Sequence, residues 1–362
     1  MGKPREIGCN TGAGMKGGQL LYEVAQLPTL QNRVYGSKLE ARTCLKGDVR
    51  LIEDPRTGLV YNETFRPELM LYDAGYNNEQ AISPYFQAHL RTMSKIVGQH
   101  LGRKGIVEIG CGKGYFLEML TADGFDVIGF DPTYDGHNPR VRKEYFKSIH
   151  GSRCDGFVLR HVLEHIQNPV EFLFTLKEEN DNAGKIYIEV PCFDWICLHG
   201  AWFDIFYEHV NYFRLSDFYR MFGTLEVAER SFGGQYLSIV ADLRRLRRPE
   251  IDAADRVNFP DNFAASLRPH GTGPTAIWGA RSKGVIFALL MERLGVEFNF
   301  VIDINFAKQG RYLPGTGLRI SSPTEALKQL EEHMIIYVMN SNYLSEIKEL
   351  SQNRFVYVTV DV

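Results

Sequence analysis

The segment 107–116 constrains the fold of this chain most, because a short apolar run leads directly into glycines at alternate positions. It reads Val-Glu-Ile-Gly-Cys-Gly-Lys-Gly-Tyr-Phe. We expect a buried strand that enters a tight turn and continues into a helix over 117–123. Gly110, Gly112 and Gly114 let the backbone approach a ligand where a Cβ atom would collide, and the N-terminus of the helix faces that ligand. The pattern predicts a binding loop of cofactor size.

Two carboxylates accompany this loop. Glu108 stands two residues before the first glycine, where a carboxylate can hold a charged amino group or a ribose. A second strand is expected over 126–130 and is followed by Asp131, at the position where doubly wound folds bind ribose hydroxyls. The spacing Gly-x-Gly-x-Gly differs from the Gly-x-Gly-x-x-Gly of dinucleotide sites. Taken alone, the loop is also compatible with a β–α turn whose glycines serve packing.

Length and charge narrow the classes of function. The chain has 362 residues, enough for two or three domains that each bury a core. A formal charge of −3 and a pI near 6.4 give no electrostatic reason to expect nucleic acid or a membrane as partner, so a small-molecule substrate is favoured. No apolar run approaches the roughly 20 residues that span a bilayer, and we expect a cytoplasmic protein.

The cysteines give no sign of a metal site or of a disulfide framework. None of the six forms a Cys-x-x-Cys pair, the spacing that most structural zinc sites use. We therefore expect reduced thiols and no bound metal.

Alternation of strand, loop and helix predicts a doubly wound, parallel α/β sheet in the middle of the chain, with its ligand at the carboxyl ends of the strands. A helix over 84–101 leads into this domain, which we place at 84–248. Residues 1–83 are expected to form a small, irregular module. A second β–α–β pattern begins at Thr275 within 249–362, after a linker rich in arginine and proline.

A cluster of aromatic residues over 202–213 surrounds the pair Glu208-His209. A histidine titrates near neutral pH and can take a proton from a substrate carbon or oxygen, while a neighbouring acid raises its basicity. The same pattern is compatible with a histidine inside an aromatic core. A second pair, Glu164-His165, follows a strand expected over 157–161, and we interpret it as mostly structural.

Two further segments carry candidate binding groups. Tyr72 and Tyr76 are four residues apart and can share one helical face, either as core packing or as hydroxyls that line a polar pocket. The loop Gly279-Ala280-Arg281-Ser282-Lys283-Gly284 has the composition of a phosphate-binding turn, with two cations near a helix N-terminus. A strand that ends in Asp303 follows it, and a basic stretch comes next. This set predicts a nucleotide or sugar pocket, or equally a solvated loop.

With these later segments included, 107–116 resembles the first motif of class I S-adenosylmethionine (SAM)-dependent methyltransferases. The strand at 157–161, followed by Val-Leu-Glu-His-Ile and Asn168-Pro169, extends the match. The order of parts is similar, over nearly the whole chain, to the nucleotide-sugar C-methyltransferases of deoxysugar biosynthesis. These have a small N-terminal domain, a SAM domain that carries Tyr-x-Glu-His-x-x-Tyr-Phe, and a Rossmann-like C-terminal domain. The matching C-terminal pieces are Gly279-Ala280, Lys283-Gly284, Asp303, Asn305, Lys308-Gln309-Gly310-Arg311 and Pro314-Gly315-Thr316.

The resemblance implies an α/β chain with a class I SAM-methyltransferase sheet, a small N-terminal module and a C-terminal Rossmann-like domain. It implies SAM as cofactor and a nucleotide-linked sugar as substrate, with His209 as the base that removes a proton next to a sugar ketone. Candidate cofactor residues are Glu108, Gly110, Cys111, Gly112, Gly114, Tyr115, Asp131, Pro132 and His161. Candidate catalytic residues are His209, Glu208, Tyr207, Tyr76 and Tyr72. Candidate substrate residues are Tyr212, Arg281, Lys283, Asp303, Lys308 and Arg311.

The sequence departs from this family at two places. The family usually binds zinc through paired cysteines in its N-terminal domain, whereas 54–60 contains no cysteine. The tyrosine two positions before the glutamate is Phe206 here, although Tyr207 is its neighbour. The acceptor atom therefore stays open, and O- or N-methylation of a sugar or secondary metabolite, or nucleotide-sugar binding without catalysis, are the alternatives.

Overall fold

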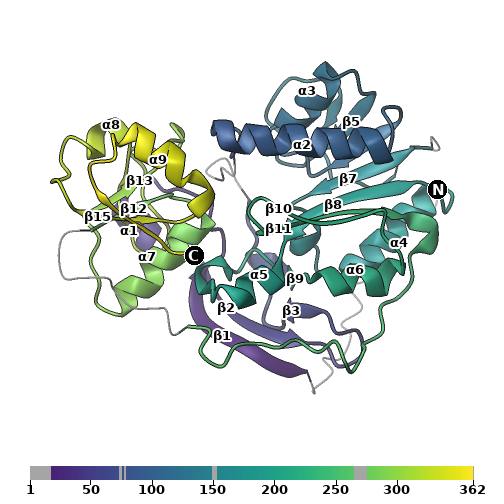
Figure 1. The fold of residues 1–362 in the computed structure, drawn as a ribbon, viewed down its shortest axis with the longest axis horizontal. Coiled ribbons are helices and arrows are strands. Elements are labelled where there is room, and N and C mark those ends of the chain that lie inside the picture. The colour runs from purple at the N-terminus through teal and green to yellow at the C-terminus, as the bar shows by residue number, and fades with distance from the viewer. Residues whose placement is uncertain (1–17, 73–75, 77–78, 149–152, 265–274, 362) are drawn as a thin grey trace, which may run out of the picture.

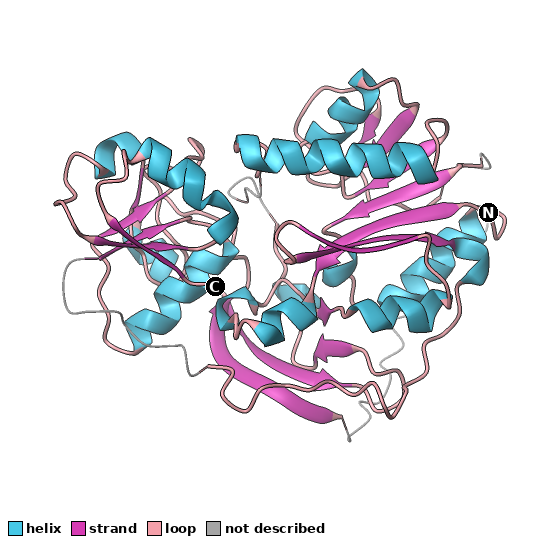
Figure 2. Ribbon diagram, viewed as in Figure 1, coloured by secondary structure: helices cyan, strands magenta, loops and turns pink. Residues whose placement is uncertain are grey.

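The computed structural model describes residues 18–361 except 73–75, 77–78, 149–152 and 265–274. Its strands form three sheets of four, seven and five strands. Figure 1 shows the sheet nearest the C-terminus in a lobe of its own, and Figure 2 shows the long antiparallel strands that run beneath the other two sheets.

The seven-stranded sheet is central and has the order β10-β11-β8-β7-β4-β5-β6. Five adjacent strands are parallel, while β11 runs antiparallel to β8 and β10 antiparallel to β11. The predicted doubly wound α/β sheet is therefore confirmed, with an antiparallel edge. Its strands are β4 (Ile106–Ile109), β5 (Val127–Phe130), β6 (Val141–Arg142), β7 (Gly156–Arg160), β8 (Lys185–Pro191), β10 (Val227–Ser231) and β11 (Tyr236–Asp242).

Helices cover both faces of this sheet, which is why β4 is buried along its whole length. The helices α2 (Pro84–His100) and α3 (Tyr115–Ala122) pack on one face, and α4 (Pro169–Glu179) and α6 (Leu215–Phe222) pack on the other. A short helix, α5 (Phe193–Leu198), follows β8. α3 begins two residues earlier than expected, because the left-handed Gly114 ends the loop and caps the helix.

The N-terminal sheet is more regular than the sequence suggested. It is antiparallel, with the order β1-β2-β3-β9, and its strands are β1 (Gln19–Pro28), β2 (Lys46–Glu53), β3 (Val60–Asn62) and β9 (Asn211–Tyr212). A short helix, α1 (Lys38–Arg42), joins β1 to β2. Since β9 belongs to the aromatic segment 202–213, the N-terminal sheet holds the chain next to Glu208 and His209 in place.

The C-terminal sheet is parallel throughout and has the order β14-β13-β12-β15-β16, as expected for a Rossmann-like unit. Its strands are β12 (Thr275–Trp278), β13 (Phe300–Ile302), β14 (Ile320–Ser321), β15 (Ile335–Val338) and β16 (Val356–Thr359), and its helices are α7 (Ser282–Arg293), α8 (Pro323–Ala326) and α9 (Leu344–Leu350).

The helix α7 is buried along most of its length because it packs against two layers at once. Phe287 on this helix stacks on Trp202 of the aromatic segment, with ring centroids 5.6 Å apart. The C-terminal unit is thus anchored next to the segment that carries Glu208 and His209. The boundaries at 83 and 248 stay predictions.

None of the helices in the described ranges is both long and apolar enough to cross a bilayer. The five cysteines in those ranges are free, and Cys9 lies outside them.

Candidate active site

A cavity of about 800 Å³ opens at the carboxyl ends of β4 and β5. Eight of the nine predicted cofactor residues line it, and Gly114 is the exception. The eight are Glu108, Gly110, Cys111, Gly112, Tyr115, Asp131, Pro132 and His161.

The three glycines of the loop have different roles. Gly112 has φ +56°, and a Cβ atom there would meet nothing within 4 Å. Gly110 has φ +71°, but a Cβ atom there would collide with the side chain of Val162, so this glycine serves packing. Gly114 has φ +82° and caps α3. Only Gly112 keeps free the kind of space that a ligand can fill.

Asp131 fixes the shape of the loop. Its Oδ2 accepts a hydrogen bond from the backbone N–H of Gly112 at 2.8 Å, and its Oδ1 accepts one from the N–H of Thr133 at 2.8 Å. These bonds tie the end of β5 to the turn after β4, so the carboxylate and the glycine face the same cavity.

Glu108 is buried, and its Oε2 has no hydrogen-bond partner in the described part of the chain. Burial raises the pKa of Glu108 to about 7, although the charge of Arg160 works in the opposite direction. An unpartnered carboxylate oxygen beside an open glycine fits the ammonium and hydroxyl groups that SAM carries. Glu108, Gly112 and Asp131 would therefore hold SAM.

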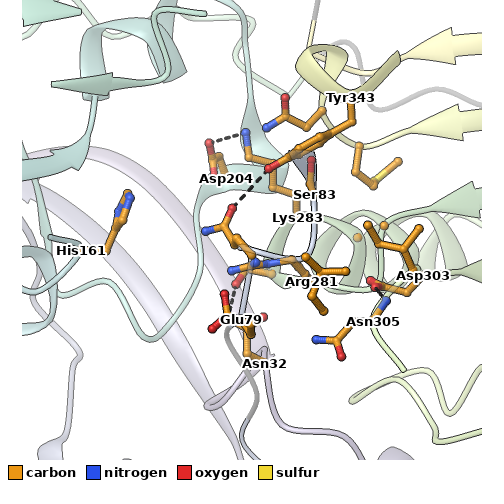
Figure 3. A pocket seen from close by; sticks show the side chains of 18 of the residues that line it. Asn32, Glu79, Ser83, His161, Asp204, Arg281, Lys283, Asp303, Asn305 and Tyr343 are labelled. Atoms are coloured by element: carbon orange, nitrogen blue, oxygen red, sulfur yellow. Dashed lines mark hydrogen bonds and ion pairs between the residues drawn. The ribbon is translucent and has the colours of Figure 1, made fainter. Parts of the chain in front are cut away.

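A second cavity, of about 190 Å³, lies between the central sheet and the loops of the C-terminal sheet (Figure 3). His209, Glu164 and Asp204 line it from the central part, and Arg281 and Asp303 line it from the C-terminal part. The residues that line both cavities mark where the two meet. They are Tyr76, Glu79, Gln80, His161, His165 and Glu208.

The carboxylate of Glu208 is held from the N-terminal side. Its Oε1 accepts hydrogen bonds from the N–H groups of Gln31 at 2.5 Å and Asn32 at 3.3 Å. Its Oε2 accepts the hydroxyl of Tyr76 at 2.9 Å. Burial nevertheless raises the pKa of Glu208 above its ordinary value. The structure thus brings Tyr76 and Glu208 together as a hydrogen-bonded pair.

His209 is 7% exposed, and its Nδ1 has no hydrogen-bond partner among the described residues. Burial, helped by the charges of His165 and His161, lowers the pKa of His209 well below its ordinary value. The imidazole is therefore neutral near pH 7 and can accept a proton.

His161 has the opposite charge state. It lies between Glu164 at 3.3 Å and Glu189 at 3.0 Å. Burial disfavours its charged form, but the hydrogen bonds to these two carboxylates prevail and raise the pKa of His161 to about 9. A neutral histidine and a charged histidine therefore line the same cavity.

The pair Glu164-His165, which we interpreted as mostly structural, faces the cavities. His165 lines both cavities, and its Nδ1 lies 2.8 Å from the carbonyl oxygen of Glu208. One donor atom from each of Glu164, His165 and His209 lies within 4.8 Å of the other two. No sequence motif indicates this group, since 44 positions separate His165 from His209.

Two predicted tyrosines line neither cavity. The hydroxyl of Tyr207 accepts a hydrogen bond from the N–H of Arg66 at 2.8 Å, and its ring packs on Phe65. The hydroxyl of Tyr212 bonds the backbone of Phe206 at 3.0 and 3.1 Å. Both hydroxyls are therefore engaged elsewhere. Tyr72 lines the larger cavity, with its ring edge-to-face on Tyr76.

The predicted substrate cations divide into three groups. Arg281 lines the smaller cavity, as Figure 3 shows. Lys283 also lines it, but its Nζ pairs with Asp204 at 3.0 Å. Lys308 is fully buried and donates to the carbonyl of Ala280 at 3.0 Å, while Arg311 is exposed. Neither of the last two lines either cavity, and their assignment to the substrate stays a prediction.

Asp303 repeats the arrangement of Asp131. Its Oδ2 accepts the N–H of Ala280 at 2.7 Å and its Oδ1 accepts the N–H of Asn305 at 2.8 Å. In both units, an acid at the end of the second strand holds the turn after the first strand.

Sequence reasoning missed several residues of the smaller cavity. They are single polar or aromatic side chains on separate elements, and no motif marks them, although Tyr236 does start a predicted strand. They are Asn32, Glu79, Ser83, Asp204, Tyr236, Asn340, Tyr343 and Glu346.

A family model matches the central part of this chain, and a curated relative matches most of it. Residues 78–225 match the family model of a methyltransferase domain. C-methyltransferase NovU of Streptomyces niveus is 23% identical over 331 residues, covering 74% of this chain and 76% of that protein.

Two solved structures align with this chain over less than half of its length. The PH0226 protein of Pyrococcus horikoshii OT3 is 15% identical, with a TM-score of 0.36 over 49% of this chain and 99% of its own. The magnesium protoporphyrin IX methyltransferase of Synechocystis PCC 6803 is 14% identical, with a TM-score of 0.35 over 46% of this chain and 89% of its own.

The glycine loop with its two acids, the seven-stranded sheet and the family match over 78–225 agree with one another. The protein is a SAM-dependent methyltransferase with a class I α/β fold.

Proposed function

We propose that this enzyme methylates a carbon atom next to the ketone of a nucleotide-activated sugar, with His209 as general base. The observation that carries the proposal is a neutral, buried histidine with an unpartnered nitrogen, in a cavity that meets the cofactor cavity. The distant similarity to a C-methyltransferase supports carbon as the acceptor.

SAM supplies a methyl group on a positively charged sulfur, and the acceptor must be a nucleophile held in line with it. A carbon next to a ketone becomes a nucleophile only when it loses a proton. His209 would take that proton, and its low pKa keeps it in the accepting form at neutral pH.

The negative charge that develops on the ketone oxygen needs a partner. Tyr207 and Tyr212 do not serve, because backbone groups engage their hydroxyls. His161 lines the same cavity, and its raised pKa keeps it charged at neutral pH. Glu164 and Glu189 face both ring nitrogens of His161, so this side chain would contribute positive charge near the oxyanion and no hydrogen bond to it.

The nucleotide would lie on the C-terminal side of the smaller cavity. Asp303 stands where the second strand of a Rossmann-like unit binds ribose, and Arg281 supplies a positive charge for a phosphate. The sugar would then extend from these loops toward His209.

The test is mass spectrometry and NMR of products after incubation with SAM and a panel of nucleotide-linked keto- and hydroxy-sugars. We expect a new methyl group on carbon, from keto-sugars only. A methyl ether or a methylamine would indicate a heteroatom acceptor, and SAM binding without turnover on any substrate would indicate a binding protein.

A further inference from the structure

Three side chains of the active site lie close enough to bind one metal ion together. The proposed reaction uses His209 as a base and needs no metal ion at these residues. They are Glu164, His165 and His209, and one donor atom from each lies within 4.8 Å of the other two. Two histidines and one carboxylate suit zinc and similar divalent ions.

Two of these side chains have an unpartnered atom. Oε2 of Glu164 and Nδ1 of His209 are buried and have no hydrogen-bond partner among the described residues. Glu164 is 1% exposed and His209 is 7% exposed. A buried polar atom without a partner costs free energy unless a ligand satisfies it.

The third side chain is oriented as metal-binding histidines usually are. Nδ1 of His165 lies 2.8 Å from the carbonyl oxygen of Glu208, and a carbonyl only accepts, so this nitrogen carries the hydrogen. The lone pair is then on Nε2. A hydrogen bond from one ring nitrogen to a carbonyl fixes the tautomer in many metal sites.

Carboxylates near the site favour a cation, while the charged His161, 3.3 Å from Glu164, opposes it. Glu164 is a carboxylate at the site, and Glu208, which precedes His209 in the chain, lines the same cavity. Donor atoms around a zinc ion lie roughly 3.3 Å apart. Side-chain rotations that move each donor atom by about 1 Å would bring the three atoms to that separation.

We propose that Glu164, His165 and His209 bind one divalent transition-metal ion, such as Zn²⁺, and that this ion blocks turnover. Only the inhibition of turnover rests on the proposed function, whereas binding of the ion does not. An ion on His209 takes up the lone pair that would accept the proton. Metal occupancy and base catalysis therefore exclude each other, and zinc acts as a reversible inhibitor at the site where both cavities meet.

The test uses the full chain, freed of metal with a chelator and titrated with Zn²⁺ in a calorimeter. We expect one ion per chain, and binding at least tenfold weaker in Glu164→Gln and in His165→Asn. The matched control is His137→Asn, an exposed histidine of the same region, which should bind as the wild type does. Equal affinity in Glu164→Gln and wild type, or the absence of a stoichiometric site, would overturn the proposal.

Co²⁺ provides a second readout that needs no substrate. We expect visible absorption of a low-coordinate cobalt ion without a thiolate charge-transfer band, and its loss in Glu164→Gln. A thiolate band would place the metal on a cysteine and overturn the assignment. Thermal unfolding of each apo variant checks that the fold is retained.

Turnover separates this inference from the proposed function. Zinc should inhibit sugar methylation in the wild type, with reversal by chelator, and an increase in turnover on adding zinc would overturn the blocking role. If no sugar is methylated but the ion binds, only the proposed function fails. If methylation depends on His209 but no ion binds, only the present inference fails.

Discussion

Burial acts in opposite directions on the two key titratable side chains of the site. It raises the pKa of Glu108 to about 7 and lowers the pKa of His209 well below its ordinary value. In both cases the charged form is the one that loses water. Each side chain keeps one atom without a partner, so each is prepared for a group of a ligand.

The charge of Glu108 should make SAM binding depend on pH. Its carboxyl is protonated below about pH 7 and charged above it, and only the charged form attracts the ammonium group of SAM strongly. We expect SAM affinity, measured by calorimetry at pH 6, 7 and 8, to rise through pH 7.

The control for this prediction is a pair of variants. Glu108→Gln should lose most of the rise in SAM affinity, while Glu118→Gln, at an exposed position on α3, should keep it.

The folding stability of the protein without SAM should fall, not rise, as the pH increases through 7. A raised folded pKa stabilises below the unfolded value near 4.5, and that contribution is lost as the pH rises through about 7. An identical pH profile in Glu108→Gln would exclude this carboxyl.

His209→Asn should reduce turnover by about 10² to 10⁴ while SAM still binds, because the step that is lost is proton transfer. The asparagine has a similar size but accepts no proton near neutral pH. Steady-state rates at saturating substrate, with SAM affinity from calorimetry, provide the measurement. His137→Asn should keep wild-type turnover, and near-normal turnover in His209→Asn would assign the base elsewhere.

For single residues, the sequence predicted a place in the site where that place follows from local structure. Glu108, Gly112 and Asp131 are next to strand ends, so the sheet places them automatically. Tyr207 and Lys308 lie outside both cavities, because the direction of a side chain depends on partners that are distant in sequence, Arg66 in one case and Ala280 in the other. No local pattern contains that information.

Among the elements, the loop between β4 and α3 lines the cofactor cavity. The strands of the central sheet next to this loop were the easiest to predict. β4 is apolar except for Glu108, and β7 is apolar up to Arg160, as expected for buried parallel strands. β1 escaped prediction because it is half exposed and its pairing with β2 is irregular at two places. β9 has two residues and exists only because β3 pairs with it.

Gly112→Val should abolish SAM binding, since its side chain would enter the space that the cavity leaves open. Gly102→Val is a matched control. Gly102 also has a positive φ, of +85°, and open space around its missing Cβ, but it lies outside both cavities. Both variants carry similar backbone strain, so both should melt earlier by a similar amount. Unchanged SAM affinity in Gly112→Val by calorimetry would contradict the loop assignment.

In the whole molecule, contacts between the three sheets build the smaller cavity. Asn32 is the clearest case, because its N–H bonds Glu208, its Nδ2 donates to Ser282 at 2.9 Å, and its Oδ1 accepts from Lys308 at 3.4 Å. Asn32, four residues after the end of β1, thus connects the proposed catalytic carboxylate with the loop before α7. The sequence predicted the three units but could not predict this junction, since the residues that meet there are up to 276 positions apart.

The last prediction concerns the two cations of the loop before α7, which the structure separates. Arg281→Ala should weaken binding of a nucleotide-linked sugar by roughly 1.5 to 3 kcal/mol, the range for a lost charge-assisted hydrogen bond, and leave SAM affinity unchanged. Lys283→Ala should mainly lower the melting temperature, because it removes the ion pair with Asp204 that joins two units and leaves a buried carboxylate without its cation.

The control for both is Arg311→Ala, an exposed cation of the same unit outside both cavities. It should change neither quantity. Calorimetry with the sugar nucleotide and a thermal melt of each variant give the two readouts. Normal substrate binding in Arg281→Ala would mean that the C-terminal unit does not hold the phosphate, and the nucleotide would then have to lie along the central sheet, where His161 is the nearest cation to both cavities.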